Sequence, residues 1–172
     1  MARRPVPELT AGYLQAVTTR YLSLRSTSSA HLRRLLLERA RRSPTPAPAA
    51  RELVEVEITR LLEGGWLDDQ RYADALVRTL HARGGSAARI RGALVAKGVA
   101  EEVSTGALAA LGDEAGDPEW LAALTWARKR RLGPWRSTPG SAEDRGRELA
   151  RMGRAGFPYG LARRVLELTE IP

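Results

Sequence analysis

Residues 64–73 read Gly-Gly-Trp-Leu-Asp-Asp-Gln-Arg-Tyr-Ala, a stretch that combines a helix stop, a short connector and a helix start. Gly64 and Gly65 can adopt left-handed backbone angles and so end the leucine-rich helix before them. Either Asp68 or Asp69 can accept backbone N–H bonds from the first turn of the next helix, where negative charge is also favourable. The stretch therefore predicts two helices held in one fixed relation.

The remaining residues of this stretch support the same interpretation. Trp66 and Leu67 precede the cap, where an apolar pair can pack onto the next helix at Tyr72 or Ala73. The paired aspartates could instead form a metal or acid–base site, but neighbouring residues at a helix start point about 100° apart. No third carboxylate stands at ligand spacing nearby. We interpret the stretch as a structural joint between the two helices, made of Gly65, Trp66, Leu67, Asp68, Asp69 and Tyr72.

Helical spacing of apolar residues continues on both sides of the joint, and no β-hairpin pattern occurs. Three helices are expected before it and six after it, which predicts an all-α protein. A Pro-rich loop is expected at 43–50, and the tract 43–48 within it is predicted to be non-helical. The acidic stretch 112–118 is predicted to be a linker. The expected helices before the joint cover about 7–24, a segment capped by the serines of 26–29, and about 51–63.

An internal repeat organises these helices. Residues 28–36 align with 86–94, and the glycine-led segment from Gly98 aligns with the one from Gly156. Ala40 takes the corresponding place in the first unit. Each unit would hold an opening helix, a capped middle helix and a closing helix, and such small units gain stability by stacking. The predicted architecture is an elongated, curved array of three such repeats, at 1–64, 65–112 and 113–172.

Composition narrows the classes of function. The 172 residues include no cysteine, which excludes disulfides, thiolate zinc sites and cysteine nucleophiles. No apolar run approaches the roughly 20 residues that span a bilayer. The basic N-terminus, residues 1–5, is not followed by the apolar segment of a secretory signal. A cytoplasmic protein is therefore expected.

The net charge of +8 is distributed unevenly along the chain. Residues 1–50 hold nine basic residues against two acidic ones, 51–120 hold eight against thirteen, and 121–172 hold eleven against five. This basic–acidic–basic order indicates that the two ends engage a polyanion or an acidic protein surface. Of the 28 basic residues 26 are arginines, which fits either GC-rich coding bias or selection for bidentate contacts with phosphate or carboxylate.

Clusters of basic residues are the candidate contact residues. Isolated exposed arginines contribute little to folding, whereas several that converge on phosphates make binding strongly salt-dependent. The tract 128–131 spans a full helical turn, so part of it must face solvent. Among the tryptophans, Trp120 and Trp126 are predicted to lie in the core and Trp135 in an exposed loop. The candidate basic residues are Arg89, Arg91, Lys97, Arg128, Lys129, Arg130, Arg131, Arg151, Arg154, Arg163 and Arg164.

Catalysis finds no support in the sequence. His31 and His81 lack cysteine partners and a neighbouring nucleophile, so helix packing or surface positions are expected for both. The glycine pairs at 64–65 and 84–85 are not followed by the Gly-Lys-Ser/Thr of a phosphate loop. No catalytic residue, cofactor or metal site is predicted.

The central unit resembles the bacterial RecX family. Residues 65–73 match that family's pattern of Gly-x-Leu-Asp-Asp, two variable residues, an aromatic residue and Ala. The basic amphipathic helix of 90–97, which ends in Lys97-Gly98, follows at the family's spacing, and 154–159 resemble its closing unit. The resemblance covers roughly residues 13–170. The Pro-rich insertion, the missing glycine at Ala40 and a middle helix expected to be shortened or diverged around 149–154 depart from the pattern.

This resemblance implies a monomeric, non-enzymatic regulator of the RecA recombinase. Such proteins lie along the groove of the RecA filament on single-stranded DNA, and they suppress ATP hydrolysis, strand exchange and co-protease activity in the SOS response. Two alternatives stay open from the residues alone. One is a general basic DNA-binding architectural protein that acts without RecA and binds duplex DNA, and the other is a helical scaffold for an acidic protein.

Overall fold

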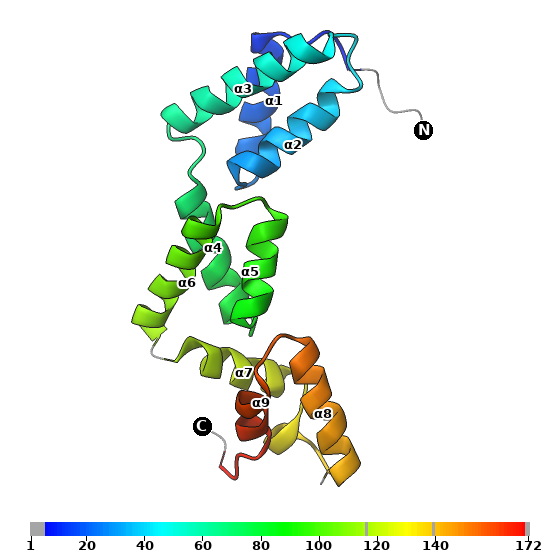
Figure 1. The fold of residues 1–172 in the computed structure, drawn as a ribbon, viewed down its shortest axis with the longest axis vertical. Coiled ribbons are helices and arrows are strands. Elements are labelled where there is room, and N and C mark those ends of the chain that lie inside the picture. The colour runs from blue at the N-terminus through cyan, green and yellow to red at the C-terminus, as the bar shows by residue number, and fades with distance from the viewer. Residues whose placement is uncertain (1–5, 116, 139, 171–172) are drawn as a thin grey trace. The chain divides into compact units, whose positions relative to one another are not determined.

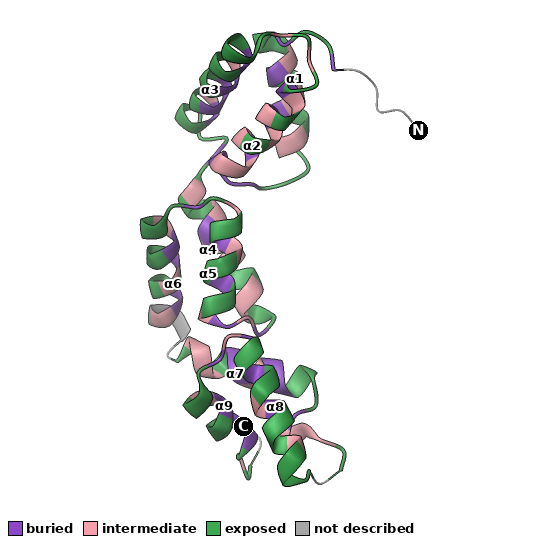
Figure 2. Cartoon of the chain, turned by 45° about the vertical axis from the view of Figure 1, so that its right-hand side comes forward, coloured by how far each residue is buried: buried purple, intermediate pink, exposed green. Residues whose placement is uncertain are grey.

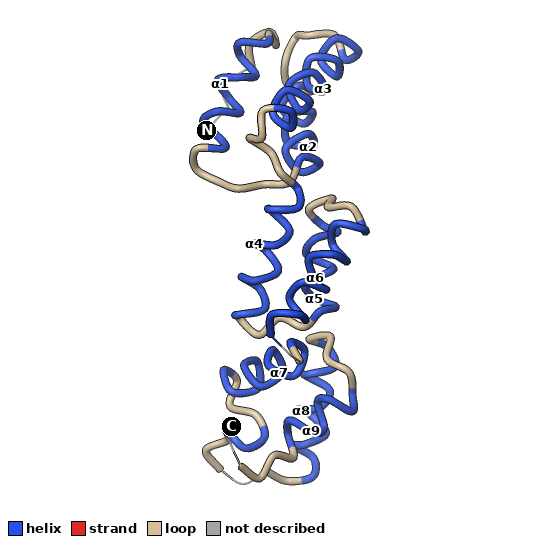
Figure 3. Tube along the Cα trace, turned by 90° about the vertical axis from the view of Figure 1, so that its left-hand side faces the viewer, coloured by secondary structure: helices blue, strands red, loops and turns tan. Residues whose placement is uncertain are grey.

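The computed structural model describes residues 6–115, 117–138 and 140–170, and these residues form helices joined by turns (Figures 1 and 3). The basic segment 1–5 lies outside them. Nine α-helices, one 3-10 turn and no strand occur in the described part of the chain, which confirms the all-α prediction. The elements are α1 Ala11–Leu22, α2 Ser29–Ala40, α3 Ala47–Glu63, α4 Asp69–Ala82, α5 Ala87–Ala96, α6 Glu101–Ala115, α7 Pro118–Lys129, η1 Gly133–Trp135, α8 Ala142–Arg154 and α9 Tyr159–Leu166.

Contacts divide the chain into two units. The first unit comprises the residues up to 73 together with 96–100, and the second comprises 74–95 together with the residues from 101 onward. The unit boundaries therefore fall inside α4 and near the end of α5. The repeat boundaries expected after residues 64 and 112, and the expected curvature, stay predictions.

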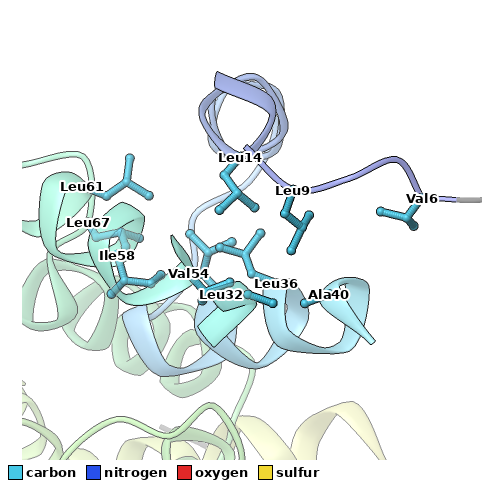
Figure 4. Packing of buried hydrophobic residues seen from close by; sticks show 11 residues of the cluster. Val6, Leu9, Leu14, Leu32, Leu36, Ala40, Val54, Ile58, Leu61 and Leu67 are labelled. Carbon is cyan, nitrogen blue, oxygen red and sulfur yellow. The ribbon is translucent and has the colours of Figure 1, made fainter. Parts of the chain in front are cut away.

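The core of the first unit forms where α3 packs against both α1 and α2. Leu14 of α1, Leu36 of α2 and Ile58 of α3 are almost fully buried and point toward one another (Figure 4). Leu67 from the connector after α3 joins the same core. Burial follows the apolar stripe of each helix, as the periodicity of the sequence predicts (Figure 2).

The second unit repeats this arrangement at its C-terminal end, because α9 packs against both α7 and α8. Trp126 and Phe157 meet edge to face there, with ring centroids 5.9 Å apart. Trp126 is buried in this core and Trp120 packs against it, which confirms the prediction for both.

Two matched contacts confirm the internal repeat. The Ser28 hydroxyl, at the start of α2, donates to the Lys97 carbonyl at 2.5 Å, within the first unit. The Ser86 hydroxyl, at the start of α5, donates to the Ala155 carbonyl at 2.7 Å, within the second unit. In each case the turn after a middle helix docks on the start of the preceding middle helix.

An acidic side chain completes each of these contacts. Asp69 Oδ1 accepts the Ser29 backbone N–H at 2.7 Å, and Glu119 Oε2 accepts the Ala87 backbone N–H at 2.8 Å. Asp68 is the helix cap, since its Oδ1 accepts the backbone N–H of Arg71 at 2.8 Å. The two aspartates of the joint therefore have different roles: Asp68 caps α4, and Asp69 ties α4 to the start of α2.

Several predicted helix limits are wrong, and α1 begins at Ala11 rather than at about 7. The helix α3 begins at Ala47 rather than 51, because a proline such as Pro48 is tolerated in a first turn that has no N–H partner to lose. The helix α6 continues past Gly112 to Ala115 and so occupies the first part of the linker expected at 112–118. The helix α8 has 13 residues instead of being shortened, and Ser141 with Asp144 forms a capping box at its start.

The tryptophans of the two connectors depart from prediction. Trp66 does not pack onto α4: its side chain is 67% exposed, whereas Leu67 beside it is 3% exposed. Trp135 lies in the turn η1, is half-buried and packs against the second core, instead of standing in an exposed loop.

Candidate functional site

The end of α7 carries the most basic tract of the chain. Arg128 and Lys129 lie exposed in the last turn, where positive charge interacts favourably with the helix dipole. Arg130 is the C-cap residue, and its guanidinium lies over the Trp126 ring, 4.0 Å from the centroid. Arg131 has a φ of 54°, a left-handed conformation that costs a non-glycine residue about 1 kcal/mol or more. This backbone strain therefore falls on a residue of the basic tract.

Three arginines, from α5, the end of α7 and α8, interact electrostatically beside this tract. Burial lowers the pKa of Arg130, and the positive charges of Arg89 on α5 and Arg151 on α8 lower it further. No acidic side chain pairs with Arg89, Arg130 or Arg151 among the residues that the structure describes. Like charges at short range destabilise the folded chain unless an anion neutralises them. We name Arg89, Arg130 and Arg151 the arginine cluster.

A groove of about 370 Å³ adjoins the arginine cluster and is lined by Arg130, Arg131 and Arg151. Arg136, which also lines the groove, is neutralised internally, because it pairs with Glu148 at 2.9 Å and with Asp144 at 3.3 Å. Arg130, Arg131 and Arg151 are exposed, so a ligand could reach their guanidinium groups. This arrangement suits an anion with several negative charges, such as a phosphodiester chain.

The other predicted basic residues have separate surroundings. Arg91 and Arg154 are exposed, as are the two arginines of α9. Of those two, Arg163 pairs with Glu167 at 3.8 Å, and Arg164 lies over the Trp120 ring at 4.9 Å. The structure thus groups Arg89, Arg130, Arg131 and Arg151. It remains a prediction that all the named basic residues contact a partner.

Lys97 belongs to a smaller basic group in the first unit, which the sequence analysis missed. Arg34 donates to the Ala96 carbonyl at 3.3 Å and its Nη2 lies 2.7 Å from Nδ1 of His31. Burial lowers the pKa of His31, and the charges of Lys97 and Arg34 lower it further. The repeat could have indicated this group, because His31 aligns with Arg89 of the arginine cluster.

The described part of the chain holds neither a group of side chains suited to a metal ion nor a membrane-spanning helix. No group of three or more histidine, aspartate or glutamate side chains is placed to hold a metal ion there. None of the helices among these residues is long and apolar enough to cross a membrane.

Comparison with known proteins gives consistent matches. Residues 68–108, which run from the cap of α4 into α6, match the family model described as "RecX, second three-helix domain". The regulatory protein RecX of Myxococcus xanthus is 36% identical over 160 residues, which cover 90% of this chain and 84% of that protein. The regulatory protein RecX of Agrobacterium fabrum is 33% identical over 103 residues, covering 60% and 53% respectively.

The fold is also found among solved structures. A crystal structure of regulatory protein RecX superimposes with a TM-score of 0.70 over 92% of this chain and 72% of the other, at 22% sequence identity. The match supports an arrangement of three-helix units, the same element that the family model describes for residues 68–108.

Proposed function

This chain belongs to the RecX family of regulatory proteins, and we propose that it inhibits the RecA recombinase. It binds the filament that RecA forms on single-stranded DNA, as a monomer in the cytoplasm, and does no chemistry itself. Lying in the filament groove, it suppresses ATP hydrolysis, strand exchange and co-protease activity, and so regulates DNA repair and the SOS response.

The arginine cluster is the observation that carries this proposal. Arg89, Arg130 and Arg151 converge from three helices without a described acidic partner. A filament groove offers both the phosphates of the DNA strand and acidic protein side chains, and either would neutralise the cluster. Removal of the cluster should therefore weaken filament binding while the cores of both units stay intact.

Titration of the purified chain into RecA's DNA-dependent ATPase assay tests the proposal. Substoichiometric protein should slow ATP hydrolysis, and preformed and nascent filaments should be compared because a regulator of growth would act on nascent filaments first. The absence of any effect up to equimolar protein would refute the proposal.

A matched pair of variants connects the assay to the site. Arg130→Ala removes a member of the arginine cluster, whereas Arg145→Ala removes an exposed arginine of α8 that does not line the groove. Only the first should reduce inhibition. Competition between RecA-coated strands and bare duplex DNA addresses the architectural alternative, which predicts no preference for the coated strands.

A further inference from the structure

The exposed tryptophan of the joint is held in place without being buried. The connector from α3 to α4 (Figure 1) carries Trp66, whose side chain is 67% exposed. Its backbone is nevertheless fixed, because Leu61 O accepts the N–H groups of Trp66 at 2.9 Å and Leu67 at 3.1 Å. A large apolar ring fixed in solvent is costly for a free protein, and aromatic residues in such positions commonly contact a partner.

Both glycines of the joint serve the position of this indole. Gly65 has a φ of +69°, which L side chains rarely adopt, so the turn immediately before Trp66 favours glycine. A Cβ atom at Gly64 would lie 2.9 Å from Cδ1 of the indole, so only glycine leaves the ring its space. The Gly-Gly-Trp sequence therefore positions a side chain as well as ending a helix.

The indole borders a pocket of about 380 Å³ that lies within the first unit. Two exposed cations, Arg25 and Arg71, line it, and the guanidinium group of Arg25 lies over the Tyr21 ring, 5.9 Å from the centroid. Asp68 is the acidic lining residue, and its Oδ1 caps the Arg71 backbone. The full lining is Thr19, Leu22, Ser23, Arg25, Ser26, Thr27, Gly65, Trp66, Asp68, Arg71 and Tyr72.

We propose that this pocket binds one base of single-stranded DNA, stacked on Trp66, with the neighbouring phosphates held by Arg25 and Arg71. Aromatic stacking platforms beside exposed cations are the common design of proteins that bind single strands without reading their sequence. Hydroxyl groups such as that of Ser26 suit the sugar and base edges better than they suit an apolar peptide. The proposal rests on the proposed function, which brings the chain to a single strand.

The test separates stacking from charge. Full-length protein is titrated by fluorescence anisotropy with labelled oligo(dT) and with an abasic strand of equal length, which keeps the phosphates and lacks the bases. Wild type should bind oligo(dT) more tightly, and Trp66→Ala should weaken oligo(dT) binding about tenfold while leaving abasic binding unchanged. Trp66→Phe should retain part of the preference, and Val56→Ala, which removes a side chain 61% exposed on α3 outside the pocket, should retain all of it.

Each contrary outcome is informative. Equal binding of the two strands by wild type, or unchanged oligo(dT) binding by Trp66→Ala, would overturn the stacking site. If Trp66→Ala bound oligo(dT) normally but no longer inhibited RecA's ATPase, the indole would contact protein instead of a base, and the proposed function would stand. Failure of the proposed function is distinguishable, because wild type would not slow the ATPase at all.

Discussion

Among single residues, Glu57 on α3 shows how the first core accommodates a charge. Its side chain is 3% exposed, and Oε1 accepts the Thr18 hydroxyl at 2.5 Å and Arg60 Nη2 at 2.8 Å. Burial by itself would raise the pKa of Glu57, but the hydrogen bonds from Arg60 and Thr18 and the charge of Arg60 outweigh it. The pKa of Glu57 therefore lies below its ordinary value of 4.5.

A carboxyl group with a lowered pKa stabilises the fold above its unfolded pKa and loses that contribution as the pH falls through the folded pKa. We expect Glu57→Gln to lower the free energy of unfolding by about 2 kcal/mol at pH 7, the size of hydrogen bonds to a charged group. The difference between wild type and variant should shrink as the pH falls below 4.5. Urea unfolding followed by circular dichroism at several pH values measures it.

The comparison needs a control because other acids titrate in the same range. Burial raises the pKa of Glu119, so the pH dependence of its contribution to stability has the opposite sign. That contribution is present at low pH and is lost as the pH rises through the folded pKa. Glu55→Gln removes the exposed partner of Arg33 and should change the free energy of unfolding by less than about 1 kcal/mol at every pH. A pH-independent effect of Glu57→Gln would contradict the prediction.

Single residues also mark where prediction from sequence fails. The sequence predicts an exposed Trp135 and a packed Trp66, and the structure reverses both. Neither outcome follows from local composition. Trp66 follows a left-handed Gly65 and stays exposed, whereas the turn η1 brings Trp135 against a core built from residues far along the chain.

Among secondary-structure elements, the contact between middle helices is the best-specified feature. Gly98, which follows α5, has a φ of +72°, and an added Cβ would lie 2.7 Å from the Cβ of Ala30 on α2. Gly98→Ala therefore combines backbone strain with a steric clash, and we expect the free energy of unfolding to fall by about 2 kcal/mol. Thermal and urea unfolding measure it.

A glycine inside α5 supplies the control. Gly92 lies inside α5, and nothing stands within 4 Å of an added Cβ. Gly92→Ala should raise the free energy of unfolding by about 0.5–1 kcal/mol, because alanine loses less conformational entropy in a helix. If Gly98→Ala and Gly92→Ala lowered the free energy of unfolding equally, the contact with Ala30 would not explain the loss.

The two aspartates before α4 should differ when each is replaced. Asp68→Ala removes a helix cap, so we expect a loss of about 1 kcal/mol. Asp69→Ala removes hydrogen bonds from the Ser29 backbone N–H at 2.7 Å and from its hydroxyl at 2.6 Å, and a loss of about 2 kcal/mol is expected. Urea unfolding of the two single variants measures the difference, and a larger loss for Asp68→Ala would contradict the assigned roles.

Helix type was predictable from the sequence, while several helix ends were not. The spacing of apolar residues and the caps at Ser28 and Ser86 identify the elements and the repeat. Proline and glycine were given too much weight as breakers, since Pro48 fits a first turn and α6 continues beyond Gly112. Packing against a neighbouring helix decides such cases, and a single sequence does not contain that information directly.

At the scale of the whole molecule, the chain comprises two contact-defined units, each with a core of its own. The alternation of charge along the sequence identified the basic ends, yet it did not identify the arginine cluster. That cluster needs α5, α7 and α8 to come together within the second unit, and only tertiary packing brings Arg89 near Arg130 and Arg151. The sequence therefore predicted the basic residues of the candidate site but not which of them lie near one another.

The salt dependence of DNA binding distinguishes a localised site from general positive charge. Each phosphate contact with a single strand contributes about 0.7 to the slope of log affinity against log salt concentration. The triple variant Arg89→Ala, Arg130→Ala, Arg151→Ala should therefore lower the slope for oligo(dT) by about 2. A second triple variant, Arg78→Ala, Arg83→Ala, Arg145→Ala, removes the same charge from exposed positions outside the arginine cluster and its groove. Because both variants reduce the net charge from +8 by the same amount, equal slopes would refute a localised phosphate site.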